Sequence, residues 1–162
     1  MPKKLCSCNP KQEDYEKFMR MAIEESIISV KEGQTPFGAV IVKDGKIIAK
    51  AHNSVYKTSD PTAHAEMNAI RIASSKAGIN LKGAILFSSC EPCPMCFSAS
   101  HWAKISEIVY GATIDDARKL GFREISIYNK DFLSKGSSIK IIPGLLRKEA
   151  VKAMKKWKGR PY

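Results

Sequence analysis

The amino-acid sequence predicts an α/β protein, a three-layer α-β-α sandwich in which helices cover both faces of a five-stranded mixed sheet. The first observation is a hairpin signal, Asp44-Gly45, between two strand-length apolar runs. The second is the alternation, after that hairpin, of strand-length and helix-length segments, which is typical of a sheet covered on both sides. The third is the length of 162 residues, which suits one domain. We expect this domain to span residues 13–162, behind a flexible tail of residues 1–12.

The N-terminal third is expected to hold one helix and two antiparallel strands. A helix from Glu13 to about Lys31 is predicted because its apolar residues recur at the spacing of one helix face, and because Gly33 follows. The two strands, residues 37–42 and 47–49, flank the hairpin turn and therefore pair with each other.

A second helix is predicted after the hairpin, with Asp60 as its candidate N-cap and Pro61 in its first turn. It runs to about Ala77. His64 and Glu66 are therefore expected within its first turn.

The rest of the chain repeats the alternation. We expect a strand at 84–88, a helix from about 91 to 103, a strand at 105–110, a strand at 139–142 and a closing helix at 145–157. The helix after the first of these strands begins around two prolines, which places Cys93 and Cys96 in its first turn.

Composition excludes a membrane protein and leaves several soluble classes open. The chain has 44% hydrophobic and 27% charged residues, as a globular protein does. Its longest apolar runs fall far below the roughly 20 residues that a membrane span needs. No apolar segment follows Lys3 and Lys4, so we expect a cytoplasmic protein without a secretory signal. A net charge of +11 favours contact with anions, including nucleic acid, but it also simply confers solubility.

The cysteines indicate a reducing compartment and a metal. Five is an odd number, and Cys93 and Cys96, three apart on a helix, share one face and can bind one metal ion. Cys90 is expected to be a small buried hydrophobe. Cys6 and Cys8 lie in the tail, where incidental thiols and metal or intermolecular roles stay open.

His64 supplies a third ligand, and a set of two Cys and one His leaves the fourth position of a tetrahedral Zn²⁺ ion to water. One Zn²⁺ per subunit with a bound water is therefore expected. An open zinc site lowers the pKa of its water to about 7, and Glu66 is close enough in sequence to carry the proton. The competing interpretations are a structural zinc and a Cys-x-x-Cys redox pair beside an unrelated His.

The two segments together carry a family resemblance. His64-Ala65-Glu66 followed by Pro92-Cys93-Pro94-Met95-Cys96 is the H-x-E and P-C-x-x-C pattern, so the chain resembles the zinc-dependent cytidine/deoxycytidylate deaminase superfamily. Within it the chain resembles the bacterial guanine deaminases, and the tRNA adenosine deaminases second, over roughly residues 13–128. The resemblance implies a cytidine-deaminase-like fold, Glu66 as an acid/base and not a ligand, and a homodimer.

The resemblance also implies substrate contacts. Phe37 and Trp102 stand where the guanine deaminases place aromatic walls, Asn53 where they place an amide that binds the base, and Ala65 belongs to the same expected set. The family closes its pocket with a C-terminal aromatic, and this chain ends in Tyr162. Core packing for the two aromatic walls, and a turn-forming role for Asn53, are the alternatives.

A second catalytic carboxylate is implied further along. The run from Gly121 to Tyr128 resembles the guanine deaminases, whose usual Gly-Phe-Asp-Asp is here Gly-Phe-Arg-Glu. Glu124 then stands for the second Asp, which that family is thought to use on the purine, and Arg123 replaces the first. The alternative is that Glu124 is a solvated loop charge.

The predicted function is zinc-dependent hydrolytic deamination of a free nucleobase, guanine to xanthine with release of ammonia. The alternatives are a tRNA adenosine-to-inosine deaminase and a deaminase of cytosine or another amino-heterocycle. The tRNA alternative draws on the basic face of the closing helix, which includes Lys148, Lys152, Lys155 and Lys156. A third class, a nucleic-acid-binding module without activity, is disfavoured because the metal and acid/base residues are all present.

Overall fold

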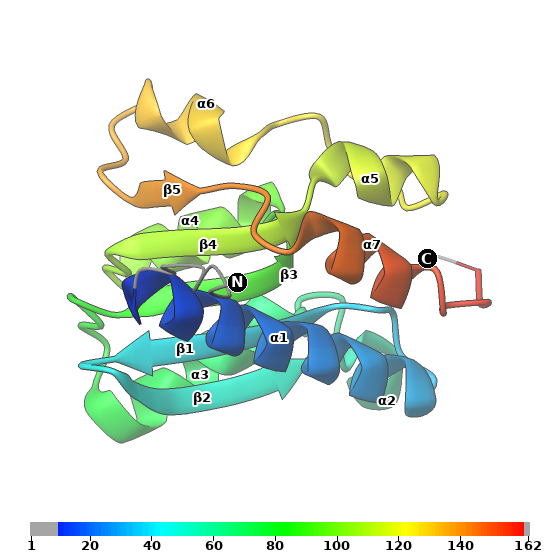
Figure 1. The fold of residues 1–162 in the computed structure, drawn as a ribbon, viewed down its shortest axis with the longest axis horizontal. Coiled ribbons are helices and arrows are strands. Elements are labelled where there is room, and N and C mark those ends of the chain that lie inside the picture. Colours follow the sequence, from blue (N-terminus) through cyan, green and yellow to red (C-terminus); the bar gives the residue numbers. More distant parts are fainter. Residues whose placement is uncertain (1–9, 161–162) are drawn as a thin grey trace, which may run out of the picture.

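The computed structural model describes residues 10–160, which form one five-stranded sheet between two layers of helices (Figure 1). The strands lie in the order β2-β1-β3-β4-β5. Their bounds are Gly38–Lys43 for β1, Lys46–His52 for β2, Ile85–Cys90 for β3, Glu107–Ala112 for β4 and Lys140–Ile142 for β5. β1 is antiparallel to β2 and β3, whereas β3, β4 and β5 run parallel, so the sheet is mixed as predicted.

The helices of the described residues cover both faces of this sheet. Figure 1 places α1 and α7 on one face and α3 and α4 on the other. The helix bounds are Pro10–Lys31 for α1, Val55–Thr58 for α2, Ala65–Ala77 for α3, Pro94–Trp102 for α4, Ile114–Lys119 for α5, Asn129–Leu133 for α6 and Arg147–Met154 for α7. The predicted three-layer sandwich is therefore confirmed.

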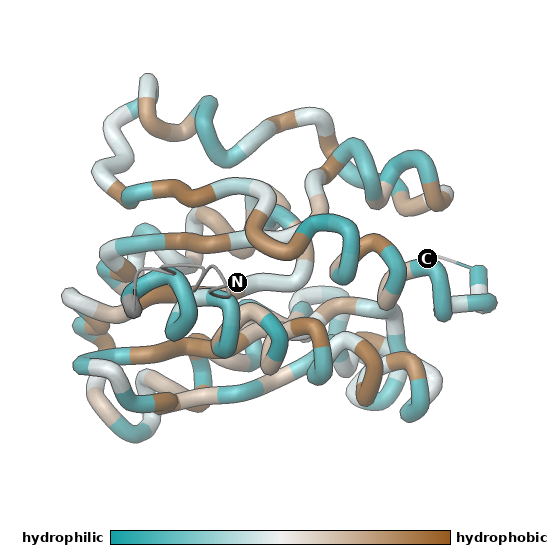
Figure 2. The backbone as a smooth tube through the Cα atoms, in the orientation of Figure 1, coloured by the Kyte–Doolittle hydropathy of each residue, from teal (hydrophilic) through white to brown (hydrophobic). Residues whose placement is uncertain are grey.

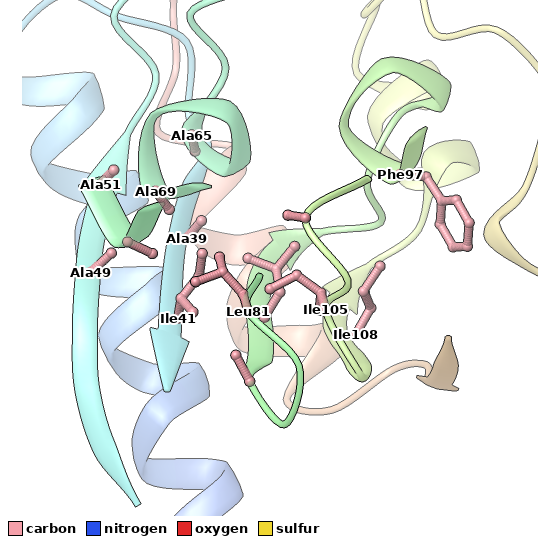
Figure 3. Packing of buried hydrophobic residues seen from close by; sticks show 14 of the residues in the cluster. Ala39, Ile41, Ala49, Ala51, Ala65, Ala69, Leu81, Phe97, Ile105 and Ile108 are labelled. Carbon is pink, nitrogen blue, oxygen red and sulfur yellow. The ribbon is translucent and has the colours of Figure 1, made fainter. Parts of the chain in front are cut away.

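The alternation of side chains along β1 explains the two layers. Ala39 and Ile41 pack into a core cluster with α3 and α4 (Figure 3), whereas Val40 and Val42 pack into a second cluster with α1 and α7. Successive strand residues point to opposite faces, and all four of these side chains are buried, so both faces need a helical cover. The hydrophobic stretches of the central strands are visible in Figure 2.

The predicted hairpin is confirmed. Asp44 and Gly45 have φ values of 50° and 72°, as a two-residue type I′ turn requires. At the start of β1, Gly38 has another role, because a Cβ atom there would collide with the backbone of Ala22 in α1 and with Ser26. The absence of a side chain lets α1 lie directly on β1, beside Phe37.

The start of α3 differs from the prediction. The N-cap is His64, not Asp60, and α3 itself begins at Ala65. Oδ1 of Asp60 instead accepts hydrogen bonds from the backbone N–H and the hydroxyl of Thr62, at 2.8 and 2.7 Å. This local turn competes with helix formation, which is why the helix starts later.

The short helices α2, α5 and α6 were not predicted from the sequence, and the closing helix α7 is shorter than the predicted 145–157. The signal for α5 was present, since Thr113 and Asp116 form a reciprocal capping box. α7 ends at Met154 because the N–H groups of Lys156 and Trp157 bond carbonyls three residues earlier, which tightens the last turn.

Among the helices of residues 10–160, none combines the length and the apolar composition that crossing a bilayer takes.

Candidate active site

Three side chains that can hold a metal ion meet at the N-terminal ends of α3 and α4. Nδ1 of His64 lies 3.6 Å from Sγ of Cys93 and 3.6 Å from Sγ of Cys96, and the three ligand atoms all lie within 4.8 Å of one another. Zinc distances of about 2.1 Å to nitrogen and about 2.3 Å to sulfur place tetrahedral N and S ligands about 3.6 Å apart. The donor set and its spacing therefore fit a tetrahedral Zn²⁺ ion.

Local backbone structure explains why these ligands meet. His64 and Cys93 are the N-caps of their helices, both with extended backbone, at φ −68° and ψ 158° and at φ −64° and ψ 166°. Pro94 starts α4, and Cys96 follows Cys93 by about one turn. Free N–H groups and the positive end of the helix dipole favour thiolates at such positions.

The two cysteines share one proton when no metal is considered. A hydrogen bond from Cys96, aided by His64 and opposed by burial, lowers the pKa of the Cys93 thiol to about 4. The same hydrogen bond, together with burial, raises the pKa of Cys96 well above its usual value. Since metals bind thiolates, zinc binding must release the Cys96 proton.

Glu66 lies beside the ligands, on the second residue of α3. It is buried, with Oε1 accepting a hydrogen bond from the Ser88 hydroxyl at 3.0 Å and Oε2 lying 3.5 Å from Sγ of Cys96. Burial, and next the negative charge of Cys93, raise the pKa of the Glu66 carboxyl. A carboxylate with a raised pKa beside the open side of a metal site can accept and return a proton.

A pocket of about 270 Å³ opens next to His64 and Cys93. Phe37 forms one wall, and its ring meets that of Phe122 edge to face, with centroids 5.1 Å apart. Apart from these aromatic rings and the two ligands, the lining consists of Thr35, Pro61, Pro94, Met95, Arg123, Glu124 and Ile125. The sequence interpretation included Phe37 but not Phe122, although Phe122 lies in the run that it singled out.

Glu124 lines this pocket. Burial raises the pKa of its carboxyl to about 7, and the negative charges of Cys93 and Glu66 add to the effect. The alternative of a solvated loop charge does not describe this position. A carboxyl group with such a pKa is present in both protonation states near neutral pH, so it can donate to or accept from a ring nitrogen.

Trp102 is not brought to the pocket within one chain. It is the last residue of α4, is 81% exposed and lines a separate hollow with Phe97 and Phe132. α4 begins at the metal ligands and leads away from them, by about 9 Å from Cys96 to Trp102 at roughly 1.5 Å per residue. Core packing, the alternative for Trp102, does not describe it either.

Asn53 and Ala65 are buried near the site, but their side chains do not line the pocket. Oδ1 of Asn53 accepts the N–H of Val55 at 3.1 Å, which matches its turn-forming alternative. The methyl of Ala65 belongs to the core, and its backbone N–H lies in the first turn of α3.

Two further expectations can be placed. Cys90 is buried as predicted, and burial raises the pKa of its thiol well above the usual value. Tyr162, expected as the aromatic that closes the pocket, and the cysteines at positions 6 and 8 lie outside the described residues.

Residues 12–112 match the family model "Cytidine and deoxycytidylate deaminase zinc-binding region". The guanine deaminase of Bacillus subtilis is 45% identical over 119 residues, which cover 72% of this chain and 76% of that protein. A tRNA-specific adenosine deaminase of Aquifex aeolicus is 43% identical over 98 residues, covering 60% of this chain and 65% of that one. The solved guanine deaminase of Nitrosomonas europaea superposes with a TM-score of 0.79 at 25% identity, over 93% of each chain.

Proposed function

Since the chain belongs to the cytidine and deoxycytidylate deaminase zinc-binding family, we propose that it deaminates a free nucleobase, guanine, to xanthine. Hydrolytic deamination itself follows from the family and from similarity to guanine and tRNA adenosine deaminases. In the proposed reaction water adds its oxygen to carbon 2 of guanine, the bond from that carbon to the amino nitrogen breaks, and ammonia leaves.

The metal site supports the chemical step. His64, Cys93 and Cys96 would hold Zn²⁺, which would lower the pKa of a water to about 7 and so make hydroxide available at neutral pH. Glu66 accepts a proton from the attacking water. It then protonates a ring nitrogen of the base and afterwards the leaving amine, so one carboxyl group carries each proton in turn. The Ser88 hydroxyl holds Oε1 of Glu66 in place for this transfer.

The single observation that supports guanine as the substrate is which residues line the pocket. Glu124 lines the same small pocket as His64 and Cys93, together with Phe122 and Ile125. A flat base can stack against the two phenylalanines, and a carboxyl group with a pKa of about 7 can bind or protonate a purine nitrogen. A volume of about 270 Å³ is of the size that a single base needs.

Asn53, Ala65, Trp102 and Tyr162 remain proposed substrate contacts. Asn53 and Ala65 are buried and do not themselves line the pocket of one chain. Trp102 can contact a base only in the pocket of a second subunit.

We therefore also propose that the protein is a homodimer. We further propose that it is cytoplasmic and that residues 13–162 form a single domain. Light scattering is expected to give a dimer for the wild type and a monomer for Trp102→Ser; a wild-type monomer would contradict the dimer.

The second candidate substrate, adenosine in tRNA, is favoured by the surface of α7. Lys148 and Lys152 are exposed on that helix and Lys155 is exposed directly after it, whereas the other face of the helix packs on the sheet through Ala150 and Met154. Lysines on one face can bind phosphates. These lysines can equally form a solvated helix face, and none of them lines the pocket.

The test is ammonia release by the zinc-loaded protein from a panel of amino-heterocycles. The panel contains guanine, adenine, cytosine, their nucleosides, aminated triazines and a tRNA anticodon stem-loop. We expect the highest kcat/KM for guanine, with xanthine as product, and no change when Lys148, Lys152 and Lys155 are all replaced by Gln. If only the stem-loop releases ammonia, and the triple variant loses that activity, the guanine proposal is wrong.

A further inference from the structure

Glu91 links two parts of the site. One is the metal loop, residues 91–93 directly before α4, and the other is the pocket wall, residues 122–125, which line the pocket. Glu91 follows the last residue of β3, directly before Pro92, and is 5% exposed. Its two carboxylate oxygens accept hydrogen bonds from two backbone N–H groups far along the chain. Oε2 accepts the N–H of Ile114 at 3.2 Å, and Oε1 accepts the N–H of Asn129 at 2.9 Å.

These two N–H groups bracket the pocket wall. Ile114 is the first residue of α5 and Asn129 the first of α6, and residues 120–128 between the two helices have no regular helix or strand. This irregular segment contains Phe122, Arg123, Glu124 and Ile125. One carboxylate therefore holds the start of α5, the helix before the segment that brings Glu124 to the pocket, and the start of α6 directly after that segment.

Asn129 adds a third link in the opposite direction. Its side chain is fully buried, and Nδ2 donates a hydrogen bond to the carbonyl oxygen of Pro92 at 2.6 Å. Oδ1 has no partner among the described residues. The amide is thus oriented by what it donates to Pro92, because a reversed amide would set two oxygens against each other.

The hydrogen bonds of Glu91 are assisted by charge and lie away from water, where such bonds are roughly twice as strong as neutral ones. Phe122 contacts Phe37 through its ring, a contact without the direction of a hydrogen bond. The three polar links from Glu91 and Asn129 are therefore directional restraints between the metal loop and the pocket wall.

We propose that Glu91 and Asn129 are positioning residues that fix Phe122 and Glu124 relative to His64 and Cys93, and so determine which base reacts. The inference rests on the proposed deaminase pocket, not on guanine in particular. Neither residue touches the substrate. Both act by fixing the relative position of two loops that are distant in sequence. One loop contains Cys93, and the other contains Phe122 and Glu124.

The matched variants are Glu91→Gln and Asn129→Asp, each close in shape to the original. Glu91→Gln leaves one of the two N–H groups without an acceptor, and Asn129→Asp sets an oxygen against the Pro92 carbonyl. The control is Glu107→Gln, another buried glutamate, which pairs with Lys140 at the opposite end of β4. The wild type's best and second-best substrates from the panel are used, so a failure of guanine does not affect this test.

We expect kcat/KM for the best substrate to fall roughly 10- to 100-fold in both variants, in line with a displacement of about 1 Å. The ratio between the two substrates should fall with it, while zinc content stays at the wild-type level. Hydrogen exchange of residues 121–128 should speed up in both variants. Glu107→Gln should lower thermal stability without changing the ratio.

Two results would overturn the proposal. One is a folded, zinc-loaded Glu91→Gln or Asn129→Asp protein whose substrate ratio stays within about twofold of the wild type. The other is loss of zinc in parallel with activity, which would make the pair supports of the metal loop alone. If Glu91→Gln does not fold, Asn129→Asp decides, because it keeps both hydrogen bonds to the carboxylate.

Discussion

The metal half and the specificity half of the pocket are ordered by different means. The metal half consists of His64, Glu66, Cys93 and Cys96, which lie at the N-terminal ends of two regular helices. The specificity half is the irregular segment 121–125, which is restrained from outside by side-chain hydrogen bonds. The first lies within the residues that match the family model, 12–112, and the second lies beyond them.

This difference teaches where each property of the enzyme resides. Helix ends fix the metal ligands through backbone geometry that a short motif specifies, so the chemistry is tied to local sequence. A segment without regular structure takes its position from distant contacts, so we expect a substitution there to change substrate choice without disturbing the metal. Substitutions in the metal half should therefore have larger effects on activity than substitutions in the specificity half.

The largest effect is expected from Cys96→Ser. A serine hydroxyl is a poor substitute for a thiolate ligand, so the variant should lose zinc and all measurable deamination. Metal analysis and ammonia release measure both losses. Cys90→Ser is the matched control, since Cys90 is buried nearby but belongs to no ligand set, and it should retain zinc and activity. A zinc-free but active Cys96→Ser protein would contradict the metal assignment.

Glu66→Gln should lower kcat by about 10²- to 10⁴-fold, the usual contribution of a general acid/base, with zinc retained. Because burial raises the pKa of Glu66, its ionised form opposes folding, and the stability from its protonated form is lost as pH rises. As pH rises, the melting temperature of the wild type should therefore fall more steeply than that of Glu66→Gln. Unchanged kcat on every substrate would refute the role of Glu66.

Glu124→Gln should lower kcat/KM for guanine roughly 10- to 100-fold, since a hydrogen bond to a charged group contributes about 1.5–3 kcal/mol. The pKa of about 7, against an ordinary 4.5, predicts a limb near pH 7 in the wild-type profile of kcat/KM. That limb should vanish in the variant.

The same shift in pKa has a consequence for stability. A carboxyl group whose pKa is raised in the folded state stabilises the protein below pH 4.5, and this contribution is lost as pH rises through about 7. Between pH 5 and pH 8 the melting temperature of the wild type should therefore fall more than that of Glu124→Gln. Parallel melting curves would contradict the buried environment of Glu124.

The smallest effect is expected from Phe122→Leu. The edge-to-face contact with Phe37 is lost while the pocket stays apolar. Aromatic pairs contribute about 0.5–1.5 kcal/mol, so KM for guanine should rise roughly 2- to 10-fold with kcat nearly unchanged. Steady-state kinetics separates the two constants. A fall in kcat with KM constant would place Phe122 in the chemical step.

Much of the fold could be predicted because its signals are local. The hairpin followed from Asp44-Gly45, and the two helix layers followed from apolar runs that are buried on both faces of the sheet. The start of α3 could not be predicted in the same way. Asp60 has the chemistry of an N-cap, and only its contact with Thr62 shows that it forms a separate turn.

The site divides along the same line. His64 and the two cysteines could be grouped from their ligand types and from the H-x-E and P-C-x-x-C patterns, and the structure brings them together. Trp102 could not be placed, because a resemblance gives a residue's position in the chain and not the direction in which α4 leads. Glu91 gave no signal, since the N–H groups that it holds lie 23 and 38 residues further on.

The most direct test compares wild type, Glu66→Gln and Glu124→Gln, all zinc-loaded, on guanine and on a tRNA anticodon stem-loop. The account predicts that Glu66→Gln lowers ammonia release about 10²- to 10⁴-fold from every substrate that the wild type accepts, whereas Glu124→Gln lowers it for guanine and changes the ratio between substrates. If Glu124→Gln slows all substrates equally, or if Glu66→Gln spares one of them, the division between chemistry and choice is contradicted.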